Sequence, residues 1–223
     1  MPQIATDNEP DEFDGVPEFV TARLRASREQ AGLSVRALAK IVDVSPSFIS
    51  QIETGKANPS VGTLLAIVSA LDITLDELFF APGGEPGSSA PAAAASRPVV
   101  ARVPAPHPPP RGPVLRSSRR QTVKLAGGVR WERLTPYTDP SMTYLYATYE
   151  VGGESSPAGV FLQHRGREYG IVLSGRLGAQ IGPTTYEVEA GDSIVTDCAI
   201  PHRFWTIGDE PAVVVWAIIT GDH

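Results

Sequence analysis

Cysteine is almost absent from this chain, occurring once in 223 residues, at Cys198. A single thiol excludes a disulfide within the chain and fits a reducing compartment. Long apolar runs are missing as well, because the longest, residues 212–219, is far shorter than the roughly 20 residues that cross a bilayer. The acidic N-terminus also lacks the basic and then apolar pattern of a secretory signal. We therefore expect a cytoplasmic protein with no membrane segment.

Positive charge is in short supply, and the net charge of the whole chain is −6. The deficit is uneven: residues 1–18 carry six acids and no base, residues 19–81 are balanced, residues 82–120 carry six arginines against one acid, and residues 121–223 have a net charge of −5. Contact with nucleic-acid phosphates depends on a local patch and not on the sum over the chain. The negative total therefore does not exclude DNA binding by residues 19–81.

Apolar groups are also scarce in the middle of the chain, where ten prolines and a run of four alanines lie between residues 82 and 120. Such a segment cannot bury a core, and it predicts a flexible, partly extended linker rich in Pro, Ala and Gly. We divide the chain into an acidic flexible N-terminus (1–18), a first domain (19–81), the linker (82–118) and a second domain (119–223).

Residues 19–81 have apolar positions at helical spacing, which predicts an all-α domain of five short helices. Ser34, Ser45 and Ser60 stand where N-caps belong, and Pro46 follows Ser45 at a first helical position. Residues 74–77, Thr-Leu-Asp-Glu, form a capping box that opens the fifth helix. Residues 34–53 are predicted to form a helix-turn-helix, with Asp43 in a left-handed backbone conformation at the turn.

This first domain resembles the xenobiotic-response-element family of helix-turn-helix domains, to which the lambdoid phage repressors and Cro proteins belong. The resemblance covers residues 19–81 and depends on three strings: Leu24-Arg-Ala-Ser-Arg28-Glu-Gln-Ala-Gly32-Leu-Ser, Leu38-Ala39, and Val44-Ser-Pro-Ser-Phe-Ile-Ser-Gln-Ile-Glu53-Thr-Gly55-Lys-Ala-Asn-Pro59-Ser. The family often has Gly where this chain has Asp43. The resemblance implies a lambda-repressor-like fold that binds double-stranded DNA.

The resemblance also assigns roles to residues. The second helix would present its N-terminal side chains to the major groove, and Gln51 is the best candidate for paired hydrogen bonds to adenine. Arg28 and Glu53 correspond to a structural ion pair. Such domains act as homodimers on near-palindromic operators. The residues that would contact DNA, by base edge or by phosphate, are Ser34, Arg36, Ser45, Pro46, Ser47, Ser50, Gln51, Lys56 and Asn58.

The second domain has the composition of strands, with short runs rich in Val, Ile, Tyr and Thr separated by Gly, Pro and Asp. This pattern predicts an all-β sandwich or barrel. The runs that stand out most are residues 143–151, 159–164, 169–173, 186–188 and 212–220.

Two strings in this domain resemble the motifs of the cupin family, a double-stranded β-helix barrel. The first runs from His164 through Glu168 to Gly175, and the second runs from Gly191 to His202. The family's first motif has one more histidine two positions before His164, and here that position is Leu162. The second motif departs too, with Thr206 where the family has Asn.

The cupin resemblance leaves three interpretations of its polar residues open. His164, Glu168 and His202 could hold a divalent metal ion with three protein ligands, line a metal-free pocket for an organic molecule, or persist as a structural remnant. No cofactor is certain, and a divalent metal is the candidate. We expect the pocket to be lined by Tyr146, Leu162, His164, Glu168, His202 and Phe204, with Tyr144, Val172 and Trp216 as further candidates.

The two resemblances together imply a sequence-specific transcriptional regulator, of the kind found in bacteria, whose cupin domain senses a small molecule and which is not an enzyme. One alternative is a metal-dependent cupin dioxygenase or isomerase fused to a DNA-binding domain. Another is a cupin that only dimerises. Because the linker is long, we expect any effect of the ligand on DNA binding to act through the geometry of the dimer or through docking of the linker.

Overall fold

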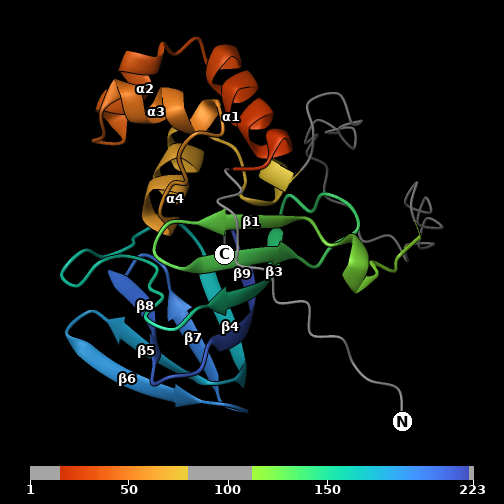
Figure 1. The fold of residues 1–223 in the computed structure, drawn as a ribbon, viewed down its shortest axis with the longest axis vertical. Coiled ribbons are helices and arrows are strands. Elements are labelled where there is room, and N and C mark those ends of the chain that lie inside the picture. Colours follow the sequence, from red (N-terminus) through yellow and green to blue (C-terminus); the bar gives the residue numbers. More distant parts are fainter. Residues whose placement is uncertain (1–15, 80–111, 221–223) are drawn as a thin grey trace, which may run out of the picture.

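The computed structural model of the chain describes residues 16–79 and 112–220 (Figure 1). The acidic N-terminus up to residue 15 and residues 80–111 of the proposed linker lie outside the described residues. The described part forms a helical domain and a domain of two sheets, as the sequence predicts. In the part of the chain that is described, no helix has the length and apolar character needed to span a membrane.

The helical domain has four α-helices whose starts follow from their capping residues. Ser34, Ser45 and Ser60 each accept a hydrogen bond from the backbone N–H three residues later, which satisfies one of the free donors at a helix start. Pro46 takes the first helical position, as predicted. The helices are α1 (Glu18–Gln30), α2 (Val35–Ile41), α3 (Pro46–Glu53) and α4 (Val61–Ala70).

The fifth predicted helix is a short 3-10 helix, η1 (Asp76–Phe79), and not an α-helix. Its capping box is present, because Glu77 accepts from the backbone N–H of Thr74 at 2.7 Å while the Thr74 hydroxyl accepts from the N–H of Glu77 at 3.3 Å. The hydrogen bonds of the box form, but the helix that they begin is only four residues long.

The turn between α2 and α3 agrees with the sequence in two details. Asp43 has a φ of 54°, so it adopts the left-handed conformation expected there. Arg28 forms a two-pronged ion pair with Glu53, with N···O distances of 2.6 and 2.9 Å, and both side chains are largely buried. This pair joins α1 to the end of α3, and hydrogen bonding to Glu53 raises the pKa of Arg28.

The second domain consists of a six-stranded sheet, in the order β1-β2-β3-β9-β4-β7, and a three-stranded sheet, in the order β6-β5-β8. All strand pairs are antiparallel. The strands are β1 (Thr122–Leu125), β2 (Val129–Arg133), β3 (Met142–Tyr149), β4 (Arg167–Ser174), β5 (Arg176–Ile181), β6 (Thr184–Glu189), β7 (Ser193–Asp197), β8 (His202–Ile207) and β9 (Ala212–Ile219), preceded by a short 3-10 helix, η2 (Ser117–Arg119).

One predicted strand, residues 159–164, is absent from this fold. That segment makes only an isolated bridge, in which Leu162 and His202 exchange backbone hydrogen bonds of 2.7 and 3.0 Å. Since the segment pairs at a single position, it crosses the end of β8 without joining the ladder. The bridge still fixes Leu162 beside His202.

The helical domain rests on the six-stranded sheet through α4, the loop before it and η1 (Figure 1). The backbone N–H of Ala126 donates to the carbonyl of Pro59 at 3.0 Å. Asp76, which is completely buried in η1, accepts two hydrogen bonds from Arg133 of β2, at 2.7 and 3.1 Å. Helices α2 and α3 lie on the side of the helical domain away from the sheets, so the predicted DNA-reading surface remains open.

Candidate functional site

Helix α3 presents its N-terminal half to solvent. Pro46, Ser47, Ser50 and Gln51 are all exposed, while Ile49 on the opposite side is buried in the core. A helix with this division can enter a major groove without disturbing its own packing. Gln51 has both its amide donor and its carbonyl acceptor available for a base edge.

The residues expected at DNA phosphates differ in what their side chains can do. Arg36 and Lys56 are exposed and can reach a phosphate directly. Ser34 and Ser45 are exposed, but their hydroxyls accept hydrogen bonds from the backbone of their own helices, so capping is their first role. Asn58 is half-buried, and its side-chain oxygen is buried without a hydrogen-bond partner. Only the amide nitrogen of Asn58 is therefore a candidate phosphate donor.

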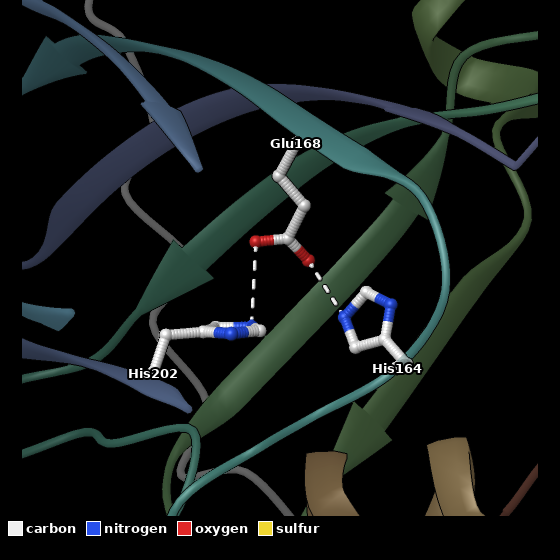
Figure 2. Close-up of side chains that lie close together, drawn as sticks. All are labelled: His164, Glu168 and His202. Atoms are coloured by element: carbon white, nitrogen blue, oxygen red, sulfur yellow. Dashed lines mark ion pairs between the residues drawn. The ribbon is translucent and has the colours of Figure 1, made fainter. Parts of the chain in front are cut away.

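His164, Glu168 and His202 meet inside the second domain, although 38 positions separate the two histidines in the chain (Figure 2). One potential ligand atom from each lies within 4.8 Å of the other two. The Glu168 carboxylate lies between the rings, 3.2 Å from His164 Nε2 and 3.7 Å from His202 Nε2. Strand β4 supplies the glutamate, the first residue of β8 supplies His202, and the loop before β4 supplies His164.

In each histidine ring, the hydrogen bond made by Nδ1 fixes the orientation of Nε2. His202 Nδ1 lies 2.8 Å from the carbonyl of Ile200, and His164 Nδ1 lies 3.1 Å from the carbonyl of Arg165. A carbonyl can only accept, so each Nδ1 carries the proton and, in the neutral ring, Nε2 keeps its lone pair. Both Nε2 atoms and one Glu168 oxygen are buried without an aligned hydrogen bond. One potential ligand atom from each of the three side chains thus faces the other two.

Electrostatics in the cluster favour positive charge. Burial lowers the pKa of His164, but the adjacent Glu168 carboxylate raises it by more, so the pKa of His164 lies above its ordinary value. Burial raises the pKa of the Tyr149 phenol, and the charge of Glu168 raises it further, so Tyr149 stays protonated at neutral pH. A buried carboxylate with this effect on its neighbours is suited to bind a metal cation, a proton or a cationic ligand group.

A cavity of about 20 Å³ adjoins Glu168. Leu162 and Phe204 line it, as predicted, and Trp216, a further candidate, does too; the remaining described lining residues are Val61, Leu65, Trp131, Leu145, Tyr149, Ser155 and Ile218. The structure corrects the expectation for Tyr146 and Tyr144. Both lie on the outer face of the six-stranded sheet, where the guanidinium of Arg120 stacks 5.3 Å from the Tyr146 ring centroid. Val172 is buried but does not line the cavity, and of the predicted cluster only Glu168 lines it, while His164 and His202 do not.

Leu162 stands where the cupin family has its first histidine. It is buried beside His202 through the backbone bridge and carries no ligand atom. Its side chain reaches α4 of the helical domain, because a Cβ atom added to Gly62 would lie only 2.9 Å from Leu162 Cδ2. The position where the cupin family has its first histidine is therefore an apolar contact between the two domains.

Sequence reasoning missed the residues that join the domains. The sequence analysis does not single out Val61 or Leu65, and it places Asp76 only within the capping box of residues 74–77. Arg133 carried no signal, since an arginine in a strand is ordinarily solvated. The one available hint was Asp76, an acid among apolar residues at the end of the domain, which needs a partner when buried.

Comparison with known proteins divides the chain in the same way. Residues 24–78 match the helix-turn-helix family, and residues 145–218 match the cupin domain family. A crystal structure of a helix-turn-helix family transcriptional regulator from Vibrio cholerae superposes with a TM-score of 0.60 at 22% identity, covering 92% of this chain and 97% of that one. That likeness shows that the two-domain fold occurs in another protein.

Two curated relatives extend the comparison. The HTH-type transcriptional regulator PuuR of Escherichia coli is 26% identical over 184 residues, which cover 82% of this chain and 84% of PuuR. The uncharacterised HTH-type regulator y4dL of Sinorhizobium fredii is 40% identical over 65 residues, covering 29% of this chain and 32% of y4dL. The chain thus contains a helix-turn-helix domain and a cupin domain, and its homology to PuuR supports a DNA-binding transcriptional regulator.

Proposed function

We propose that this regulator reads a specific DNA sequence through α3 and senses a small molecule at the His164, Glu168 and His202 cluster, in the cytoplasm. The observation that carries the sensing role is the convergence of three buried potential ligand atoms, each within 4.8 Å of the others. A buried carboxylate flanked by two imidazoles can hold a metal cation or a polar ligand group, so their arrangement supports a bound partner. Of the three sequence interpretations, this favours a ligand or metal site over a remnant.

DNA reading is tested by selection. Full-length protein is mixed with a pool of random duplexes, and the bound fraction is sequenced. We expect a motif of two similar half-sites, because two copies of the domain related by a two-fold axis match a near-palindromic operator. A pool that stays random after several rounds would contradict sequence-specific binding.

A divalent metal fits the cluster. His164 and His202 would each give Nε2 and Glu168 would give a carboxylate oxygen, with Nδ1 of each ring held by a carbonyl as is usual around metal-binding histidines. Two histidines and one carboxylate suit Fe²⁺, Mn²⁺ or Zn²⁺ with open coordination positions. Bound metal would supply a positive centre that attracts an anionic or electron-rich effector group.

Elemental analysis of protein from its natural host, compared with His202→Ala, tests the metal. A stoichiometric ion that the variant loses supports it. Sensing is tested by thermal shift with amino acids, amines and organic acids, followed by operator binding. His202→Ala should lose the response and keep operator affinity, whereas an unchanged response would place sensing elsewhere.

A second candidate function, a metal-dependent oxygenase or isomerase, is favoured by the same two-histidine, one-carboxylate set. Leu162 argues against it, because it stands at the family's first histidine position and offers no ligand atom. Turnover of an added organic acid by the Fe²⁺-loaded protein would favour the enzyme. Binding without turnover favours the sensor.

We also propose that the chain acts as a homodimer through the outer face of the six-stranded sheet. In register across β3, β9, β4 and β7, a row of four residues on this face consists of Tyr144, Ala217, Tyr169 and Val195. Ile171 and Leu173 of β4 add to this exposed apolar surface. Exposed apolar surface of this extent is suited to a second copy of the chain.

The dimer is tested by sedimentation. Ile171→Arg should shift the protein from dimer to monomer and weaken operator binding, because each domain would then bind one half-site alone. Tyr186→Arg, a comparable change at an exposed position of β6 in the other sheet, should leave the dimer intact. Equal masses for wild type and Ile171→Arg would reject this interface.

A further inference from the structure

The cavity beside Glu168 has walls from both domains. Val61 and Leu65 of α4 close it on one side, and the barrel residues Leu162, Phe204 and Trp216 line it with Glu168 on the other. The space that remains, about 20 Å³, holds roughly one water molecule. An organic molecule does not fit while α4 is in place.

The barrel residues among these walls are held by strands or by a backbone bridge, whereas α4 belongs to a separate domain. Val61 and Leu65 can leave the cavity by movement of one domain relative to the other, without breaking a strand ladder. The displacement would break the Pro59–Ala126 hydrogen bond and the pair between Asp76 and Arg133. The site thus has one removable wall.

Leu162 connects this wall to the ligand cluster. Its backbone is hydrogen-bonded to that of His202, and its side chain meets Gly62 on α4 so closely that an added Cβ would lie 2.9 Å away. A histidine ligand there would face the metal, but Leu162 instead contacts the DNA-binding domain. Where the cupin family has a metal ligand, this chain therefore has an apolar contact with α4.

We propose that α4 is the lid of the sensor site, so that an organic effector and the docked DNA-binding domain compete for the same space, with Leu162 and Gly62 at the point of contact. This inference rests on the proposed sensing function of the cupin domain. By linkage, an effector that requires the open arrangement shifts the protein toward it, and any change that opens the lid makes the site more available. A metal ion alone, being no larger than the cavity, leaves the lid closed.

Access to the site is measurable without knowing the effector. Diethyl pyrocarbonate acylates Nε2 of neutral imidazoles, and the carbethoxy group that it adds is far larger than the cavity. Nε2 of both histidines is buried, so reaction at His164 and His202 reports an opening of the cluster. Peptide mass spectrometry follows each histidine separately in the full-length protein at neutral pH, without added metal.

The central variant is Gly62→Leu. It inserts a side chain where Leu162 already lies, while Leu is a better helix former than Gly, so α4 itself is not weakened. We expect carbethoxylation of His164 and His202 to accelerate on the order of tenfold or more, since overpacking of this size shifts an opening equilibrium by at least that factor. Ser69→Leu, at an exposed position of α4 outside the cavity lining, should react as wild type.

The compensating variant makes the test specific. Gly62→Leu combined with Leu162→Ala moves the same bulk from the barrel to the helix, and the reaction should slow toward the wild-type rate. Equal rates in wild type and Gly62→Leu, or a double variant as fast as Gly62→Leu alone, would overturn the lid. Acceleration that is matched by thiol labelling of buried Cys198 would mean a loosened barrel and would overturn it as well.

These outcomes are separate from failure of the sensing function. If Gly62→Leu opens the site but no small molecule changes operator binding, the lid stands and sensing fails. If an effector is found, but His164 and His202 react at the same rate in every variant, sensing stands and the lid is wrong.

Discussion

The recognition helix and the cupin cluster differ in their relation to water. On α3, Ser47, Ser50 and Gln51 are exposed and therefore available to contact DNA. In the barrel, Glu168 and His202 are buried, with His202 fully so. A surface that reads DNA needs only a well-packed helix behind it, whereas a buried polar cluster also needs something to close it. Here the closing element comes from the DNA-binding domain.

The largest expected effect comes from breaking the buried pair that joins the two regions. Asp76→Ala removes the carboxylate partner of the buried Arg133 guanidinium, and breaking a buried ion pair in this way costs about 3–5 kcal/mol of stability. Asp76 also accepts from the Thr135 hydroxyl at 3.2 Å and from the backbone N–H of Asp139 at 2.8 Å, so these donors lose their partner too. Urea unfolding followed by circular dichroism should show the loss and a separation of helical from sheet unfolding.

Asp209→Ala is the matched control, because Asp209 is exposed in the turn between β8 and β9 and such changes usually alter stability by less than about 0.5 kcal/mol. A single, unshifted transition for Asp76→Ala would mean that the domains do not stabilise each other. The DNA-reading helix and the cupin cluster would then lie in two domains that fold independently.

The second prediction concerns the exposed region alone. Gln51→Ala should cost about 1–3 kcal/mol of binding to the selected operator and relax its preference at one base pair. Lys56→Ala should instead weaken binding to all sequences alike and reduce the slope of log affinity against log salt by about one. Fluorescence anisotropy on operator and scrambled duplexes separates the two. Equal losses for Gln51→Ala on both duplexes would remove Gln51 from base reading.

The contrast also explains how much the sequence could predict. In the helical domain, caps, the Asp43 turn and the Arg28–Glu53 pair all involve residues close along the chain or set by a long motif, and all three are present in the structure. Local hydrogen bonds determine the caps, whereas the Arg28–Glu53 pair, 25 positions apart, was expected from the family resemblance. The capping box predicted the start of the fifth helix, but it does not say where a helix ends, and η1 is a 3-10 helix of four residues.

In the second domain, the sequence could not show which side chains of a strand point into the barrel and which point outward. Strand β3 carries aromatic residues on both faces, so preferring Tyr144 and Tyr146 as inward residues put the strand one position out of phase. Leu145 and Tyr149 line the cavity instead. A shift of one residue exchanges the two faces of a strand completely. The motif spacing that named His164, Glu168 and His202 does not depend on this choice.

The sequence could not predict the contact between the domains, and the reason is different. A long proline-rich segment suggested that coupling would act through the dimer or the linker, whereas α4 and η1 provide a direct route through Gly62 and Asp76. Neither residue has a distinctive neighbour in the chain. Contacts between surfaces that are far apart in sequence leave no periodic signal.

The third prediction concerns the buried region. Leu162→His restores the fourth ligand of the cupin motif and should tighten Co²⁺ binding by about tenfold or more, which is about 1.4 kcal/mol. Phe161→His adds an imidazole one position away, at an exposed residue, and should change affinity little. Titration followed by the visible Co²⁺ bands measures both. Identical affinities for Leu162→His and wild type would show that position 162 does not face the metal.

The smallest expected effect is at Cys198, which is buried in the barrel but does not line the cavity. Burial raises the pKa of the thiol, and the negative charges of Glu168 and Asp197 raise it further. Because the thiolate is the nucleophile, a thiol whose pKa is raised well above neutral reacts slowly. We expect labelling with a disulfide reagent to be slow in the native protein and fast in urea, and we expect Cys198→Ala to leave operator binding unchanged after mild oxidation.

The rate of Cys198 labelling also distinguishes opening of the lid from loosening of the barrel. Val61 and Leu65 of α4 line the cavity with Glu168, whereas Cys198 is buried outside that lining, so Gly62→Leu should accelerate carbethoxylation of His202 without accelerating thiol labelling. Parallel acceleration of both reactions would place the motion in the barrel itself. Rapid labelling of the native wild type would contradict the burial of Cys198 and make oxidation of this thiol a candidate signal for the regulator.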